Sequence, residues 1–125
     1  MSRYLMIALG GALGSLARYG VALWVQQRVG GAFPSGTFLV NVSGCLIMGV
    51  VMTLLTEGGA FDPNWRFLVP IGFIGAYTTF STFEMETFRA VEEGGLLIAL
   101  SNIVFSVIVG FLALWLGVVG TRRLL

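Results

Sequence analysis

The sequence predicts an all-α integral membrane protein with four transmembrane helices, the third of them broken at the middle of the bilayer. Three observations support this prediction. The 125 residues are 57% hydrophobic and 10% charged, whereas charged residues make up about a quarter of a soluble domain. The apolar residues form four runs of roughly 20, each long enough to cross a hydrocarbon core of roughly 30 Å. The third run carries several hydroxyl side chains at its centre.

The composition also excludes several classes of protein. Four spans nearly use up residues 1–125, so we expect a single membrane domain and no enzyme activity. A net charge of +1, without a basic tail or patch, gives no indication of nucleic-acid binding. The chain has no histidine and one cysteine, Cys45, which excludes an intrachain disulfide and argues against a zinc or iron site.

The first span is expected at about residues 4–29. Gly10 and Gly14 are four positions apart, a spacing that lets another backbone approach closely. Arg18 lies inside this span, where a charge costs about 2.5–3.5 kcal/mol on insertion scales. We therefore expect Arg18 to face an aqueous vestibule or the carbonyl end of a helix, with snorkelling to the surface as the alternative.

The second span is expected at about residues 37–55, with Ser35 or Thr37 as the cap of its helix. Asn41 lies about one turn inside, on the same stripe as Gly44 and therefore on a buried seam. The residues alone slightly favour an interhelical hydrogen bond for Asn41 over contact with a ligand.

The third span, at about residues 66–90, contains the most informative stretch of the chain, residues 75–86. A glycine followed by five hydroxyl residues predicts a break in the helix, and unpaired backbone groups persist in a membrane where they bind an ion or line a cavity. Phe80 and Phe83 are three positions apart and would share a face. A polar line of Thr79, Thr82 and Glu86 would run beside them.

The fourth span is expected at about residues 96–119. Asn102, Ser106 and Gly110 follow one another at intervals of four residues. They make one small and polar face on an otherwise apolar helix, so we expect this face to pack against protein.

The arginines hardly specify an orientation in the membrane. With four spans, one side carries four of them and the other side carries Arg28 and Arg89, which is a weak bias. Each helix also has a small or polar face. Together these faces make up more surface than four helices can bury against one another. We therefore predict a homodimer, and two oppositely inserted copies would fit both observations.

The chain resembles the Fluc (CrcB-type) fluoride channels over essentially its full length. The resemblance rests on the stretch from Gly10-Gly11 to Arg18-Tyr19, on Asn41 with Gly44, and above all on Gly75 followed by Thr-Thr-Phe-Ser-Thr-Phe-Glu at residues 78–84. The family's usual Gly-Gly before that run is Gly75-Ala76 here. The resemblance implies an antiparallel dual-topology homodimer in a bacterial inner membrane. It also implies two pores that passively export fluoride, conferring fluoride resistance, and a structural sodium ion at the dimer centre.

The resemblance also implies the site residues. Sodium would bind the backbone carbonyls of Gly75 and Thr78 from both subunits. The matching fluoride-path residues are Phe80, Phe83 and Asn41, with Ser81, Thr82 and Glu86 as candidates for a polar track and Ser106 as a less firmly matched candidate. Independently of the resemblance, the carbonyls of a broken helix suit a small cation, and hydroxyl and amide donors suit a small hard anion.

Two alternatives stay open at this stage. A small multidrug exporter has the same size and topology but needs a membrane-buried carboxylate, for which Glu84 and Glu86 are the candidates. A membrane scaffold that transports nothing would use its polar faces for assembly only, and membrane lipid would surround the protein in each case.

Overall fold

A computed structural model describes residues 2–59 and 61–125, which are helical except for short connections. The elements are α1 (Arg3–Val29), α2 (Ser35–Glu57), the π-helix η1 (Phe67–Ile74), α3 (Gly75–Tyr77), α4 (Phe80–Glu92) and α5 (Leu96–Arg122). Within the described ranges there is no strand, and α1, α2 and α5 are long and apolar enough to cross a membrane. The prediction of an all-α membrane protein is confirmed.

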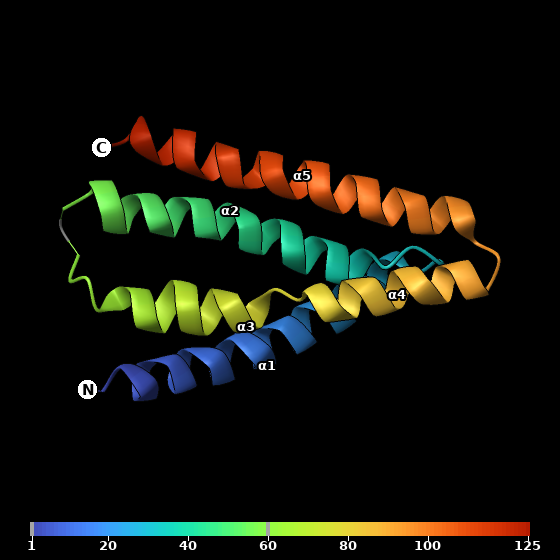
Figure 1. The fold of residues 1–125 in the computed structure, drawn as a ribbon, viewed down its shortest axis with the longest axis horizontal. Helices are drawn as coiled ribbons and strands as arrows, with labels where there is room; N and C mark the ends of the chain where they lie inside the picture. Colours follow the sequence, from blue (N-terminus) through green and yellow to red (C-terminus); the bar gives the residue numbers. More distant parts are fainter. Residues whose placement is uncertain (1, 60) are drawn as a thin grey trace.

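The elements form four rods, because η1, α3 and α4 follow one another end to end and together make the third (Figure 1). Both termini lie at one end of the bundle, together with the connection between α2 and η1. The arginines expected to share one side, Arg3, Arg66, Arg122 and Arg123, therefore gather at this end of the molecule.

The turn between α1 and α2 is closed by Gln26. Gly30 and Gly31 have φ of 66° and 78°, the left-handed region that glycine adopts at no steric cost. The side-chain oxygen of Gln26 then accepts hydrogen bonds from the Ser35 hydroxyl at 3.0 Å and the Gly36 amide at 3.2 Å. The prediction that Ser35 or Thr37 caps α2 is wrong: the helix follows Pro34 without a side-chain cap, since Gln26 reaches across from α1 to bond its first turn.

Small residues bring α1 against the first half of the third rod. A side chain at Gly10 would overlap the carbonyl oxygen of Leu68, and one at Gly14 would overlap that of Phe73. The close backbone approach predicted for this glycine pair is therefore confirmed, and η1 is its partner.

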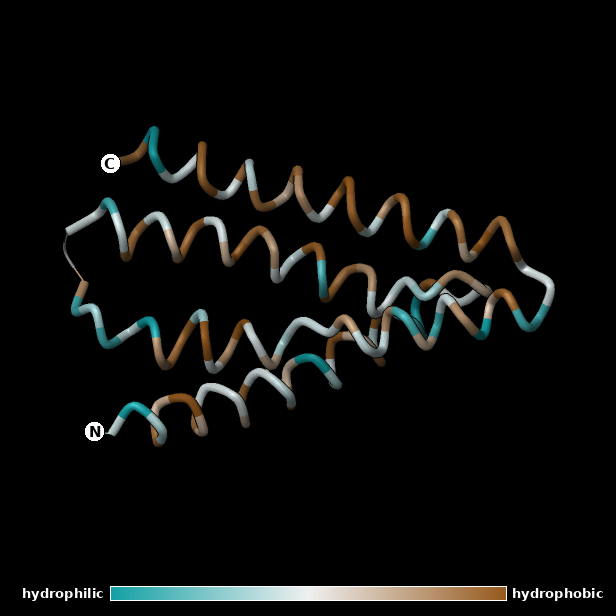
Figure 2. The backbone as a smooth tube through the Cα atoms, viewed as in Figure 1, coloured by the Kyte–Doolittle hydropathy of each residue, from teal (hydrophilic) through white to brown (hydrophobic). Residues whose placement is uncertain are grey.

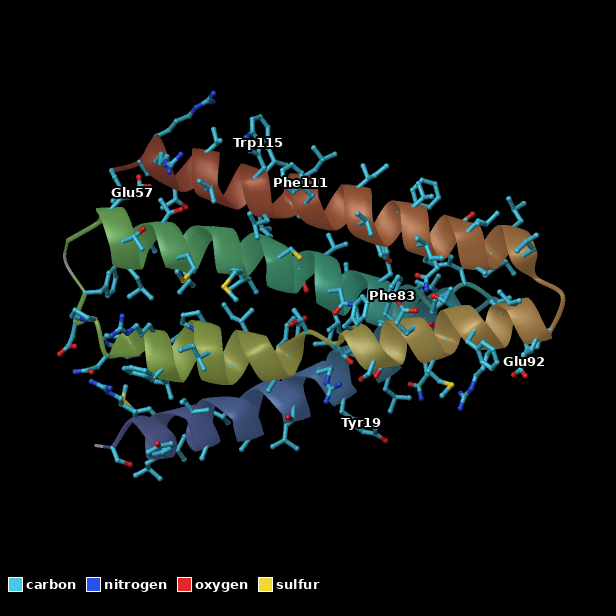
Figure 3. All side chains as sticks on the ribbon, in the orientation of Figure 1. Tyr19, Glu57, Phe83, Glu92, Phe111 and Trp115 are labelled. Atoms are coloured by element: carbon cyan, nitrogen blue, oxygen red, sulfur yellow. The ribbon has the colours of Figure 1, made fainter. Side chains whose placement is uncertain are left out.

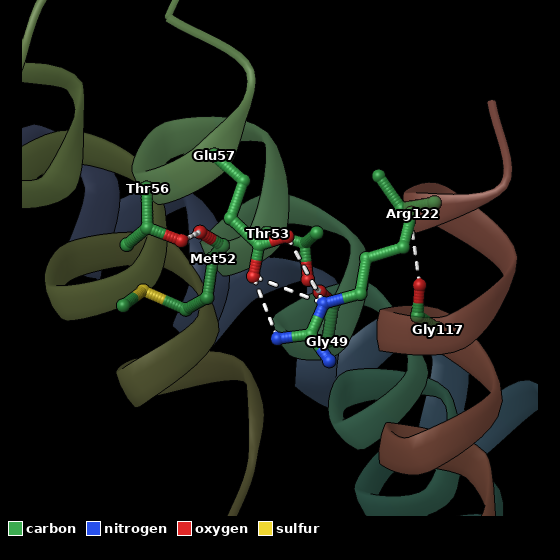
Figure 4. A network of polar contacts seen from close by, with 8 residues as sticks. Gly49, Met52, Thr53, Thr56, Glu57, Gly117 and Arg122 are labelled. Atoms are coloured by element: carbon green, nitrogen blue, oxygen red, sulfur yellow. Dashed lines mark hydrogen bonds and ion pairs between the residues drawn. The ribbon is translucent and has the colours of Figure 1, made fainter. Parts of the chain in front are cut away.

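The α2 and α5 helices pack along most of their length and are joined at their carboxyl ends. Gly49 and Gly117 each lie against the backbone of the other helix. An ion pair between Arg122 and Glu57, with 2.6 Å between Nη2 and Oε1, links the two helix ends (Figure 4). Because this pair is exposed, it marks the alignment of the helices rather than contributing much stability.

The outer surface is apolar and the interior is small. Hydrophobic residues make up most of α5 and α2 (Figure 2), and many large ones on α5 are exposed. Phe111 and Trp115 point away from the bundle and are 67% and 51% exposed (Figure 3). Among the described residues the largest fully buried side chains are Ile74, Val40 and Asn102. Such a surface requires lipid or another apolar partner around it.

Candidate functional site

The third rod is interrupted at Thr78 and Thr79. Their backbone angles, φ −83° and ψ 156° at Thr78 and φ −148° and ψ 120° at Thr79, are those of extended chain. The ribbon between α3 and α4 is accordingly drawn without a coil (Figure 1). The preceding turns are already irregular, since Pro70 has no amide hydrogen and the Gly75 amide bonds to the carbonyls of both Gly72 and Pro70. The hydrogen bonding of the helix is therefore already irregular before the helix ends.

Asn41 on α2 replaces the helical partners that Thr79 has lost. Its amide nitrogen donates to the Thr79 carbonyl at 3.0 Å, and its amide oxygen accepts from the Thr79 amide at 2.8 Å. This is the interhelical hydrogen bonding favoured from the sequence. The Thr79 hydroxyl, in turn, accepts from the Thr82 amide at 3.3 Å and so caps α4. The chain can therefore stop and restart a helix at a buried position.

The interruption leaves backbone groups without partners on both of its sides. No hydrogen bond found in residues 2–59 and 61–125 ends on the carbonyls of Gly75 or Thr78, and the amides of Phe80 and Ser81, the first of α4, have no partner within that helix. The Thr78 hydroxyl is engaged, because it donates to the Ile74 carbonyl at 3.0 Å. The carbonyl end of one helix and the amide end of the next thus lie close together along the chain, with partial charges of opposite sign.

A cavity of about 300 Å³ opens beside the break. Five of the residues predicted for the site line it: Asn41, Thr78, Phe80, Phe83 and Ser106. The rings of Phe80 and Phe83 have centroids 5.8 Å apart, which agrees with the shared face expected from their spacing. Phe83 is 6% exposed and points into the bundle (Figure 3), whereas Phe80 is 74% exposed.

The remaining predicted residues lie outside this cavity. Gly75, Ser81 and Thr82 are exposed in the single chain. Arg18 is half-buried on α1, and no hydrogen bond or ion pair of the described residues involves it. Their roles in binding sodium, in carrying fluoride or in forming a vestibule stay predictions.

Glu86 belongs to a second cavity, of about 390 Å³, near the connections between α1 and α2 and between α4 and α5. Its Oε1 accepts a hydrogen bond from the Thr37 hydroxyl at 2.8 Å, while its Oε2 is buried without a partner among the described residues. Thr37 was missed as a candidate because its place near a helix start suggested a cap. The contact joins residues 49 positions apart, which no local pattern reveals.

A chain of hydrogen bonds connects α5 to α4 beside the first cavity. Ser106 bonds to Asn102 at 3.2 Å, Asn102 bonds to Thr87 at 2.9 Å, and Thr87 bonds to the Phe83 carbonyl at 2.8 Å. Asn102 and Thr87 are buried, being 2% and 7% exposed. The polar face predicted on the fourth span does pack against protein, but Thr87 as its partner went unpredicted.

In the described part of the chain no three His, Cys, Asp or Glu residues are grouped so that they could hold a metal ion. Any cation bound at the break would therefore depend on backbone and hydroxyl oxygens. These suit a hard cation such as sodium, which binds oxygen and is not held by the soft ligands that zinc prefers.

Comparison with known proteins gives a consistent result. The model of a family described as "CrcB-like protein, Camphor Resistance (CrcB)" matches residues 5–118. A protein of Solibacter usitatus named "Fluoride-specific ion channel FluC" is 53% identical over 97% of this chain and 99% of its own length. Proteins with the same name from Acidobacterium capsulatum and Geotalea uraniireducens are 52% and 44% identical, over 96% and 99% of this chain and 97% and 100% of their own lengths.

Proposed function

Since the chain belongs to the CrcB-like family, as its resemblance to the Fluc channels indicated, we propose that it is a fluoride channel, a membrane transport protein rather than an enzyme. The observation that carries the proposal is the interrupted third rod, whose residues Thr78 to Phe80 line a cavity together with Asn41. The ion is inferred from relatives named fluoride-specific ion channels, which are 53% and 52% identical over nearly the whole chain.

The first cavity has groups that suit a small anion. One of the two Asn41 amide hydrogens is bonded to Thr79, and the other takes part in no hydrogen bond of the described residues. The Phe80 amide, at the start of α4, has no partner within that helix. Fluoride holds its water strongly, so such donors must replace that water along the path. The edges of the Phe80 and Phe83 rings are weakly positive and would guide the ion without trapping it. We place the fluoride path through this cavity, with Ser81, Thr82 and Glu86 as polar-track candidates.

The free carbonyls favour a structural sodium ion at the break. The carbonyls of Gly75 and Thr78 lack hydrogen-bond donors among the described residues, so both are available to a cation. Two copies of the chain would together supply four oxygens. When bound, the cation would supply a fixed positive charge that favours an anion nearby.

Exposure of the break in the single chain supports a homodimer. Phe80 is 74% exposed and Gly75 is exposed as well, although both belong to the candidate site. A second copy would cover them, and a pair of oppositely inserted copies would fit the weak arginine bias and give two paths. In the inner membrane of a bacterium, the potential would drive fluoride outward with about 2.3 kcal/mol per charge per 100 mV.

Reconstitution tests the proposal directly. Purified protein in liposomes loaded with potassium fluoride should release fluoride when a potassium ionophore is added, whereas protein-free liposomes should not. Liposomes loaded with potassium chloride measure selectivity. Failure to release fluoride, with the protein folded and inserted, would overturn the proposal, and equal release of chloride would restrict it to a general anion pore.

A further inference from the structure

The hydrogen bonds between α5 and α4 can run in only one direction. The Phe83 carbonyl can only accept, so the Thr87 hydroxyl must donate its single hydrogen there. Thr87 must then accept from Asn102, which fixes the amide nitrogen of Asn102 on that side. The amide oxygen of Asn102 therefore faces Ser106, and the Ser106 hydroxyl must donate to it. We refer to these three bonds as the α4–α5 hydrogen-bond chain.

This direction determines what Ser106 offers to the first cavity, which it lines together with Asn41 and Phe83. A serine hydroxyl has one hydrogen and two lone pairs. With the hydrogen directed at Asn102, only lone pairs are left for the cavity, and these repel an anion. To donate to an anion, Ser106 must turn away from Asn102 and leave a buried amide oxygen unpaired, which is unfavourable because Asn102 is 2% exposed.

We propose that Asn102 is a positioning residue that competes with the transported anion for the hydroxyl hydrogen of Ser106. The competition weakens retention of the anion in the cavity, and a conducting site must release the ion as readily as it binds it. The inference rests on the proposed fluoride channel and adds to it a residue that sets how tightly fluoride is held.

Two variants remove the competition by different routes. Asn102→Leu deletes the acceptor, so that Ser106 is free to donate to fluoride. Thr87→Val retains Asn102 but removes the hydroxyl that fixes its amide, which can then turn and donate to Ser106. Both variants should lower the half-saturating fluoride concentration for release from liposomes by about two- to tenfold, the effect of one neutral hydrogen bond.

A third substitution separates positioning from a structural role. In a Ser106→Ala background there is no hydroxyl hydrogen to compete for, so neither Asn102→Leu nor Thr87→Val should shift the half-saturating concentration. A purely structural role would give the same shift with and without Ser106. That result would overturn the inference, as would an unchanged half-saturating concentration in both single variants or failure of both to fold. If the unmodified protein releases no fluoride at all, the proposed function fails as well.

Discussion

At the scale of single residues, Asn41 is the side chain that makes the interruption tolerable. It binds both the amide and the carbonyl of Thr79, a residue that is 9% exposed. Each backbone group left unpaired at a buried position costs about 1–3 kcal/mol. Asn41 thus stabilises the break and also presents its remaining amide hydrogen beside the first cavity, so that its structural and proposed functional roles are compatible.

Replacing Asn41 should therefore affect stability as well as transport. Asn41→Leu leaves two backbone groups of Thr79 unpaired and is expected to lower the free energy of unfolding by about 2–6 kcal/mol, measured by denaturant unfolding in detergent. Ser43→Ala, on the same helix, removes the bond to the Tyr77 hydroxyl at 2.9 Å and a bond to the Val40 carbonyl within its own helix, but leaves Thr79 paired, and should cost about 1 kcal/mol. Equal losses in the two variants would show that Asn41 has no special role at the break.

The paired rings give a second prediction at this scale. Phe83→Ile and Phe80→Ile each remove an aromatic edge from the first cavity, so both should reduce fluoride release severely while leaving the oligomer intact. Phe88→Ile is the matched control, because Phe88 is 56% exposed on the same helix and does not line the cavity. Unchanged release with Phe80→Ile and Phe83→Ile, measured by a fluoride electrode, would mean that the rings serve packing alone.

At the scale of elements, the third rod is held in place by close packing against α1. The carbonyl oxygens of Leu68 and Phe73 occupy the space that side chains at Gly10 and Gly14 would need. Since these oxygens belong to the irregular turns just before the break, the position of α1 sets the position of the free carbonyls.

Gly14→Ala should consequently displace η1 and destabilise the protein. Overpacking of this kind costs about 1–3 kcal/mol, and the unfolding midpoint in detergent should fall accordingly. Gly20→Ala on the same helix is the control, because a side chain there would meet nothing within 4 Å and should leave the midpoint unchanged or slightly higher. A loss equal to that of Gly14→Ala would indicate that helix flexibility, rather than contact with η1, is what glycine provides.

The sequence predicts these elements well where the signal is local, and it misses contacts between distant segments. The apolar runs, the glycine pair and the run of hydroxyl residues each act within one helix, and each predicted a feature that is present. Three contacts join different helices: the bond of Gln26 to the first turn of α2, that of Thr37 to Glu86 and that of Asn102 to Thr87. Such contacts depend on how the rods are placed, so periodicity within a single helix could not predict them.

At the scale of the whole molecule, a single chain leaves part of the candidate site exposed. Its interior is filled largely by small residues and its surface by large apolar ones, and part of the candidate site, including Phe80, lies on that surface. Lipid can cover Phe111 and Trp115, but lipid cannot pair the free carbonyls of the break. Two copies that share a bound cation would satisfy them, which is why the proposed dimer follows more from the unpaired backbone groups than from the amount of apolar surface.

The proposed antiparallel pairing can be tested at the chain ends. Both termini lie at one end of the bundle (Figure 1), and Leu124 is 88% exposed. In a background with Cys45→Ala, Leu124→Cys gives a chain with one thiol near its carboxyl end. If copies insert in both directions, a thiol reagent that cannot cross the membrane should label about half of the chains in intact cells and the rest only after permeabilisation. The arginine distribution predicts this equality because four against two is too weak a bias to fix one orientation.

Adding arginines to the connection between α1 and α2 should drive labelling toward one side and abolish fluoride release, and coexpression with an oppositely biased variant should restore fluoride release. Labelling that is complete or absent in intact cells, together with normal fluoride release, would contradict antiparallel assembly while leaving the fluoride channel itself untouched.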